Sequence, residues 1–250
     1  MEREFDPQSH PVATEPSLAE QVQSGGTGLR VTILIIAMLM PWLWVGLGLV
    51  LIKDYRLTIL LYELFGCGLM VLLSRPKQMA LFPLRVPFSR ILVSAAIVGI
   101  VILGVFKGTG GFGMDWDYFY RQAQATHLAI NGHFWFFAAY IILLNPLFEE
   151  AFWRGAIYRE WKEIIGVLPA NLVSSFFFGA WHWVVLQHYC QPIWALFLTF
   201  WVMVGGVIFA YTYEKTGTLG APALLHGLGA DLPMVFVVYD CIQASQGVLH

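Results

Sequence analysis

The sequence predicts an all-α fold, a polytopic transmembrane helix bundle of about seven spans. The chain of 250 residues is 58% hydrophobic and only 12% charged, and its mean hydropathy is +0.67. A soluble domain of average composition carries about 25% charged residues. The apolar residues gather in runs close to the roughly 20 residues that a helix needs to cross a bilayer. We therefore expect a multi-pass integral membrane protein.

Composition also limits the partners and the domain organisation. The formal net charge is -2, so the chain lacks the basic field of a nucleic-acid-binding protein, and the lipid bilayer is the expected partner. Residues 1–28 are polar and lack the basic start and apolar core of a secretory signal peptide. We predict a disordered tail over 1–28, a single transmembrane domain over 29–240, and a short C-terminal tail over 241–250.

Seven apolar segments are the expected spans. The first contains Pro41, which can kink it. A polar loop with several prolines separates the second span from the third. Residues 107–131 are rich in glycine and then charged and aromatic, and we expect an extramembrane loop that can carry an interfacial helix. The spans are expected at residues 29–52, 57–73, 91–106, 133–152, 169–188, 193–213 and 221–238.

The distribution of Lys and Arg predicts the orientation, because loops on the cytoplasmic side carry an excess of both. With seven spans and Arg154 set aside, four such residues lie on one side: Lys53, Arg56, Lys107 and Arg121. The side of the N-terminus holds the larger group: Arg3, Arg30, Arg75, Lys77, Arg85, Arg90, Arg159, Lys162 and Lys215. The N-terminus is therefore expected in the cytoplasm.

Charged residues stand at the predicted end of the fourth span. A charge inside a bilayer costs at least a few kcal/mol, so such residues are functional by default. Glu150 and Arg154 are four residues apart and can pair on one helix face, whereas Glu149 points about 100° away and is left as a candidate general base. Asn145 lies one turn earlier and could hydrogen-bond Glu149. The alternative is that both glutamates end the helix at the headgroups, paired with Arg154 and Arg159.

Two later spans each carry a histidine, His182 and His226. A lone histidine among apolar residues is more often a satisfied core residue, but the small residues beside each one allow close helix approach. Asp231 lies five residues after His226, so an ordinary helix would not stack them. It could orient His226 only where glycines or Pro233 distort the helix. Glu63 is expected to be a structural hydrogen-bond partner or to face a cavity.

Three short motifs occur in order within about residues 140–235, each on a predicted span: Glu149-Glu150-x-x-x-Arg154, Phe178-x-x-x-His182, and His226. This order resembles the CPBP family of glutamic intramembrane proteases. That family includes the type II CAAX prenyl endopeptidases and bacterial bacteriocin-processing or self-immunity proteins. Residues 1–130 carry none of these motifs.

The resemblance implies a helical bundle with an intramembrane cavity that faces the cytoplasm, and hydrolysis of a peptide bond near the membrane interface. Glu149 and His182 would activate a water, Glu150 and Arg154 would hold the geometry, and His226 would help to stabilise the oxyanion. The implied partner is a membrane-anchored or lipidated peptide or protein, and no cofactor is implied. A bacterial or archaeal inner membrane is the expected location.

The third motif departs from the family pattern. The family usually has Asn, or sometimes Asp, four residues after the histidine, and Ala230 stands there instead, followed by Asp231. Either Asp231 substitutes through an irregular helix, or the oxyanion site is built differently. Because an ionised Asp231 would be a poor donor to an oxyanion, we favour an orienting role for it.

Two other functions stay open. One Glu and two His side chains could bind zinc, as in two-His-one-Glu peptidases, although the sequence has no H-E-x-x-H motif. The chain could also be a non-catalytic membrane scaffold or immunity protein of the same fold, and Ala230 favours this reading. A transporter would more often show an internal repeat, which this sequence lacks.

Overall fold

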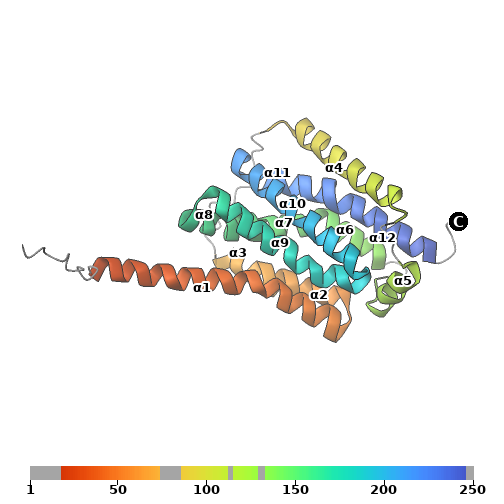
Figure 1. Cartoon of the computed structure of the whole chain (residues 1–250), viewed down its shortest axis with the longest axis horizontal. Coiled ribbons are helices and arrows are strands. Elements are labelled where there is room, and N and C mark those ends of the chain that lie inside the picture. Colours follow the sequence, from red (N-terminus) through yellow and green to blue (C-terminus); the bar gives the residue numbers. More distant parts are fainter. Residues whose placement is uncertain (1–17, 74–85, 112–114, 129–132, 246–250) are drawn as a thin grey trace, which may run out of the picture.

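The computed structural model describes residues 18–73, 86–111, 115–128 and 133–245, and every regular element among them is a helix (Figure 1). The predicted all-α bundle is thus confirmed. Five of the described helices are long and apolar enough to cross a membrane: Gly26–Ile52, Phe88–Gly108, His133–Ile165, Pro192–Thr216 and Gly220–Ala244. The chain is an integral membrane protein.

The other two predicted spans are also helical. The second predicted span coincides with one continuous helical run made of α2 (Tyr55–Leu61), the π-helix η2 (Tyr62–Gly68) and α3 (Leu69–Leu73). The fifth corresponds to α9 (Val167–Tyr189), which buries several polar side chains: Asn171, Ser174 and Ser175. Neither is among the five described helices that meet the length and hydropathy requirement, so the count of seven spans stays a prediction.

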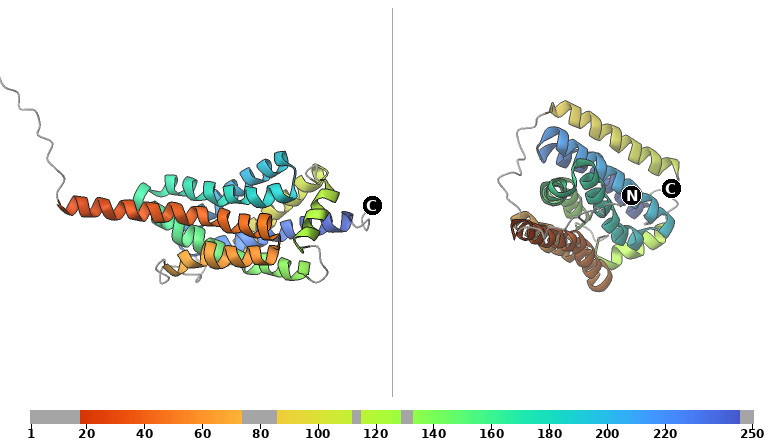
Figure 2. Two further views of the ribbon diagram at one scale, coloured as in Figure 1. Left: turned by 90° about the horizontal axis from the view of Figure 1, so that it is seen from below. Right: turned by 60° about the vertical axis from the view of Figure 1, so that its left-hand side comes forward.

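The first helix starts inside the predicted tail. α1 (Leu18–Gly46) continues into η1 (Leu47–Ile52), and Pro41 lies within it. Residues 1–17 of the predicted tail and 246–250 of the C-terminal tail lie outside the described residues. α1 extends beyond the other helices at the end of the bundle where α8 lies (Figure 2). Lys53 adopts a left-handed conformation (φ 59°) that ends this helix, and the Asp54 carboxylate then caps α2 by accepting from the backbone N–H of Arg56 at 2.9 Å.

The region predicted as an extramembrane loop does carry a helix. α4 (Phe88–Gly108) is followed by α5 (Trp116–Ala125). Asp115 caps the N-terminus of α5, and its carboxylate accepts from the Tyr118 N–H at 2.9 Å. α5 packs against α9 and α12 (Leu232–Ser245) at the end of the bundle opposite α8 (Figure 1). α5 thus covers one end of the bundle.

The predicted end of the fourth span at residue 152 is wrong. The helix runs on from α6 (His133–Leu143) through α7 (Asn145–Glu150) and η4 (Ala151–Tyr158) to α8 (Arg159–Ile165). Glu149 and Glu150 therefore lie near its middle. The charged motif resembled a headgroup boundary, but Arg154 is buried and paired within the helix, so it does not end the span.

Small residues bring the helices of the second half together. α10 (Pro192–Thr216) packs along α9. A Cβ added at Gly179 would lie 2.2 Å from Met203 Cγ, and one at Gly206 would lie 3.0 Å from Ser175 Cβ. Glycine at these positions permits the close approach that membrane helices use. α9 and α10 are therefore tightly packed against each other.

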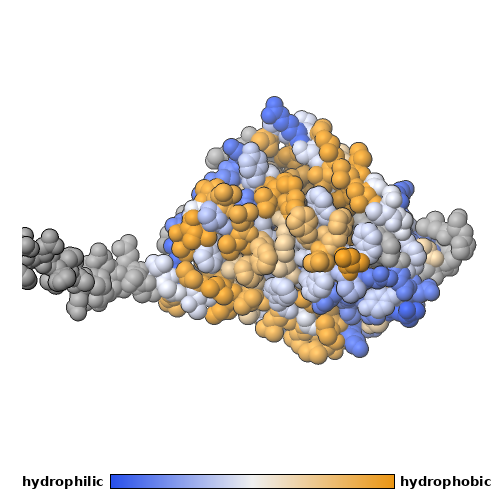
Figure 3. Space-filling model, in the orientation of Figure 1, coloured by the Kyte–Doolittle hydropathy of each residue, from blue (hydrophilic) through white to orange (hydrophobic). Residues whose placement is uncertain are grey.

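The outer surface is apolar over much of the bundle. Large hydrophobic side chains are exposed along α1, α4, α9 and α10, among them Leu43, Ile100, Leu172 and Leu196. Figure 3 shows apolar residues over the middle of one face and hydrophilic residues gathered toward its edges. An apolar exposed area of this extent is typical of a surface that contacts lipid.

Candidate active site

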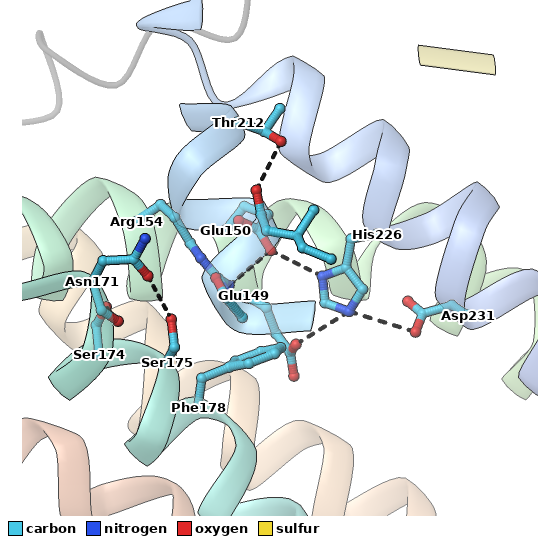
Figure 4. Close-up of polar contacts among 12 residues, drawn as sticks. Glu149, Glu150, Arg154, Asn171, Ser174, Ser175, Phe178, Thr212, His226 and Asp231 are labelled. Atoms are coloured by element: carbon cyan, nitrogen blue, oxygen red, sulfur yellow. Dashed lines mark hydrogen bonds and ion pairs between the residues drawn. The ribbon is translucent and has the colours of Figure 1, made fainter. Parts of the chain in front are cut away.

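Acidic, basic and imidazole side chains converge in the middle of the bundle (Figure 4). α7 supplies Glu149 and Glu150, which are 1% and 0% exposed, and η4 supplies Arg154, which is 1% exposed. The π-helix η5 (His226–Asp231), which follows α11 (Gly220–Leu225), supplies His226, 4% exposed, and Asp231. Charges buried this deeply are tolerated only when they are paired.

The predicted pair of Glu150 and Arg154 is present. Arg154 Nη1 donates to Glu150 Oε1 at 2.9 Å, and Nη2 donates to the backbone oxygen of Gly206 at 2.9 Å. The guanidinium carbon also lies 4.4 Å from the ring centroid of Phe178 and 5.2 Å from that of Phe209. These contacts fix Arg154 between α9 and α10, and Glu150 is held with it.

His226 is surrounded by carboxylates. Its Nδ1 lies 3.0 Å from Glu150 Oε1, and its ring stacks on Phe209 with centroids 4.7 Å apart. Its Nε2 lies 3.6 Å from Glu149 Oε2 and 3.5 Å from Asp231 Oδ1. Both ring nitrogens face carboxylate oxygens. This arrangement suits the imidazolium form, in which both nitrogens donate.

A π-helix explains how Asp231 reaches His226. In an α-helix, residue i+5 lies about 140° around from residue i. A π-helix makes i→i+5 hydrogen bonds, and η5 spans this very pair. The adjoining glycines are required by close contacts, since a Cβ at Gly227 would lie 2.5 Å from the carbonyl oxygen of Ile142. The helix irregularity considered for Asp231 is therefore present, and π-helical turns often occur at functional sites.

The two carboxylate oxygens of Glu149 differ. Oε1 accepts a hydrogen bond from Tyr62 Oη at 2.8 Å. Oε2 is buried and accepts no hydrogen bond from the described residues. The hydrogen bond that Asn145 could make to Glu149 is not found among the described residues. Because η5 brings Asp231 across from α7, the Asn145 side chain lies against Asp231 instead.

His182 lies beside this network and has no direct bond to it among the described residues. Its Nδ1 is 2.7 Å from the backbone oxygen of Phe178, and its ring centroid is 3.8 Å from that of Trp181. Phe178 is the link, because its ring also contacts His226, with centroids 5.8 Å apart. The structure thus brings most of the predicted residues into one network and attaches His182 through Phe178.

The contact of Tyr62 with Glu149 was not predicted from the sequence. Tyr62 lies 87 positions before Glu149, and its only signal was a tyrosine beside Glu63 in an apolar segment. Glu63 itself is buried and accepts a hydrogen bond from Tyr140, so the expectation of a structural hydrogen-bond partner is confirmed.

Two expectations about the site stay predictions. In the described ranges, no group of three or more His, Cys, Asp and Glu side chains is arranged to hold a metal ion. A pocket of about 260 Å³ lies near α8 and the end of α10, and it is lined by residues outside the network: Tyr158, Arg159, Lys162, Tyr213, Glu214 and Gly217. The expectation that no cofactor is needed and the expectation of a cavity beside Glu149 therefore both remain predictions.

Comparison with known protein families gives a match, and the matched segment covers most of this network. A family model described as "Type II CAAX prenyl endopeptidase Rce1-like" matches residues 131–229. The matched segment contains Glu149, Glu150, Arg154, His182 and His226, and it ends before Asp231. No curated protein and no solved structure is significantly similar to the chain.

Proposed function

Because residues 131–229 belong to the type II CAAX prenyl endopeptidase Rce1-like family, we propose that the protein is a glutamic intramembrane endopeptidase in which Glu149 is the general base. The observation that carries this proposal is the free Oε2 of Glu149. It is buried, bears no hydrogen bond from the described residues, and lies 3.6 Å from His226 Nε2. A base must keep an oxygen available for the proton that it removes.

Three side chains take part in the proposed reaction: Glu149, His182 and His226. Water binds between Glu149 Oε2 and His182. Its oxygen attacks the scissile carbonyl carbon while its proton passes to Glu149. The tetrahedral intermediate then collapses, the C–N bond breaks, and the proton on Glu149 passes to the leaving amine. His182 is half-buried and its Nδ1 is committed to the Phe178 carbonyl, which leaves Nε2 for the water.

His226 stabilises the negative charge on the carbonyl oxygen. Its Nε2 lies 3.5–3.6 Å from two carboxylates, longer than the usual 2.7–3.2 Å of an N–H···O hydrogen bond. The Nε2–H is therefore not committed to either of them and is available to an oxyanion, a contact that lowers the barrier to acyl transfer. Glu150 holds Nδ1, and Arg154 holds Glu150. Asp231 orients the ring.

The substrate is a membrane-anchored or lipidated protein that is cut near its C-terminus. The matched family is named for CAAX prenyl substrates, and the proposed base lies within apolar helices, where a soluble peptide would not reach unaided. The excess of Lys and Arg on the N-terminal side supports a cytoplasmic N-terminus, and we propose a bacterial or archaeal inner membrane. The reaction is assigned to the protein side chains alone, without a cofactor.

Cleavage by purified protein tests the proposal. A panel of prenylated and transmembrane-anchored peptides is incubated with wild type, Glu149→Gln and Glu214→Gln in detergent. Glu214 is a matched control, because it also accepts from a tyrosine, Tyr158, at 2.7 Å but lies outside the network. Products should form with wild type and Glu214→Gln and be absent with Glu149→Gln. Equal cleavage by Glu149→Gln would overturn the assignment of the base.

A further inference from the structure

Tyr62 reaches the proposed base from outside the matched segment. It lies at the start of η2, a helix run that packs against α7. Its side chain is buried, 4% exposed, and its hydroxyl donates to Glu149 Oε1 at 2.8 Å. A hydrogen bond to a charged group is stronger than one between neutral groups. This bond therefore holds one particular oxygen of Glu149.

The bond decides which oxygen can act. With Oε1 held by Tyr62, the carboxylate plane is fixed and Oε2 is the oxygen that faces His226. Without Tyr62, either oxygen could rotate into that place, and Oε1 would lose its donor. A base that is not held in one orientation spends less time in the reactive geometry, and small misplacements reduce rates strongly.

The ring of Tyr62 has a second contact with the site. Its centroid lies 4.6 Å from that of Trp181, whose centroid in turn lies 3.8 Å from that of His182. Glu149 and His182 share no bond among the described residues, although both act on the same water in the proposed mechanism. The ring contacts of Tyr62 with Trp181 and of Trp181 with His182 therefore connect the two groups.

We propose that Tyr62 is a positioning residue for the hydrolysis: its hydroxyl selects Oε2 of Glu149 as the reactive oxygen, and its ring places His182 through Trp181. This inference rests on the proposed function and extends the site beyond residues 131–229. The ordinary alternative is that Tyr62 only satisfies a buried glutamate, and that alternative predicts a loss of stability without a selective loss of turnover.

The test compares Tyr62→Phe with Tyr158→Phe. Both changes remove one buried hydroxyl that donates to a glutamate, at 2.8 Å in one case and 2.7 Å in the other, and both keep the ring. We expect Tyr62→Phe to lower kcat roughly 10- to 100-fold, the effect of losing one hydrogen bond to a charged group. KM should stay within about twofold, because the proposed role of the buried Tyr62 runs through Glu149 and Trp181. Tyr158→Phe should keep the wild-type kcat.

A second readout needs no substrate. The infrared band of the Glu149 carboxyl group is identified by its loss in Glu149→Gln. We expect this band to shift in Tyr62→Phe and to keep its position in Tyr158→Phe. Thermal unfolding of each variant in detergent confirms that the comparison is made on folded protein.

The outcomes separate the two proposals. A kcat within twofold of wild type in Tyr62→Phe, or an unmoved infrared band, would overturn the positioning role while Glu149-dependent cleavage stands. Cleavage that does not depend on Glu149 would sink the proposed function, and the infrared comparison would then still report whether Tyr62 holds Glu149. A loss of kcat as large in Tyr158→Phe as in Tyr62→Phe would also contradict the positioning role.

Discussion

Removal of Arg154 should destabilise the protein more than removal of any surface charge. The Arg154→Leu variant deletes two hydrogen bonds of 2.9 Å and leaves Glu150 buried with His226 as its remaining partner. Breaking a buried ion pair by removing one member costs about 3–5 kcal/mol. For a chain of this size, that cost corresponds to a fall of roughly 6–20 °C in the unfolding midpoint.

The double variant Glu150→Leu/Arg154→Leu distinguishes pairing from packing. It removes both charges together, so no uncompensated charge is left between them, and it should be less destabilised than Arg154→Leu by about 1–4 kcal/mol. Lys162→Leu is the control. Lys162 pairs with Glu214, and both side chains are partly exposed (37% for Lys162 and 30% for Glu214). Such pairs contribute about 0–1 kcal/mol to stability.

The assay is thermal or denaturant unfolding in detergent, followed by circular dichroism. The order of stability should be wild type and Lys162→Leu together, then the double variant, then Arg154→Leu. If Arg154→Leu unfolds within about 1 kcal/mol of wild type, the ion pair is not buried as described. A double variant less stable than Arg154→Leu would also contradict the buried ion pair.

Three further predictions concern other parts of the chain. Gly179→Ala should destabilise the protein by about 1–3 kcal/mol, because the added Cβ would lie 2.7 Å from the Met203 backbone nitrogen at the α9–α10 contact. Gly104→Ala is the control and should not destabilise the protein, because no atom lies within 4 Å of its added Cβ. Unfolding of both variants in detergent measures the difference. The hydrogen bond from Arg56 lowers the pKa of Asp54 to about 2 from its usual 3.8. This carboxylate therefore adds stability above about pH 4, and that contribution is lost as the pH falls toward 2, so Asp54→Asn should flatten the acid side of the pH–stability curve. Activity should persist after dialysis against a chelator, because the mechanism uses side chains alone, and a loss restored by zinc would favour the metal-dependent alternative.

Local spacing predicted the parts of this site that lie on one helix. The four-residue separation of Glu150 and Arg154 sufficed to predict their ion pair, since helix geometry alone brings them together. Composition likewise sufficed for the helical membrane fold. The end of the fourth span was misjudged because a charged residue satisfied within the protein has the same sequence appearance as one at the headgroups.

Contacts between distant segments were out of reach of such patterns. The hydrogen bond from Tyr62 to Glu149 joins residues 87 positions apart, and no periodicity connects them. The approach of Asp231 to His226 depends on a π-helical turn, and the sequence showed only glycines that could permit it. Tertiary packing decides both features, so they emerge only when the helices are assembled.

The most direct test of the central claim is the rate of peptide cleavage by Glu149→Gln beside that of wild type, both reconstituted in liposomes with a prenylated, membrane-anchored substrate. Gln has nearly the same shape and can still accept from Tyr62, but it cannot take a proton from water. We predict that Glu149→Gln folds with wild-type stability or better and that its kcat falls at least about 100-fold, as expected for loss of a general base. Wild-type turnover by this variant would contradict the assignment of Glu149 and, with it, the proposed mechanism.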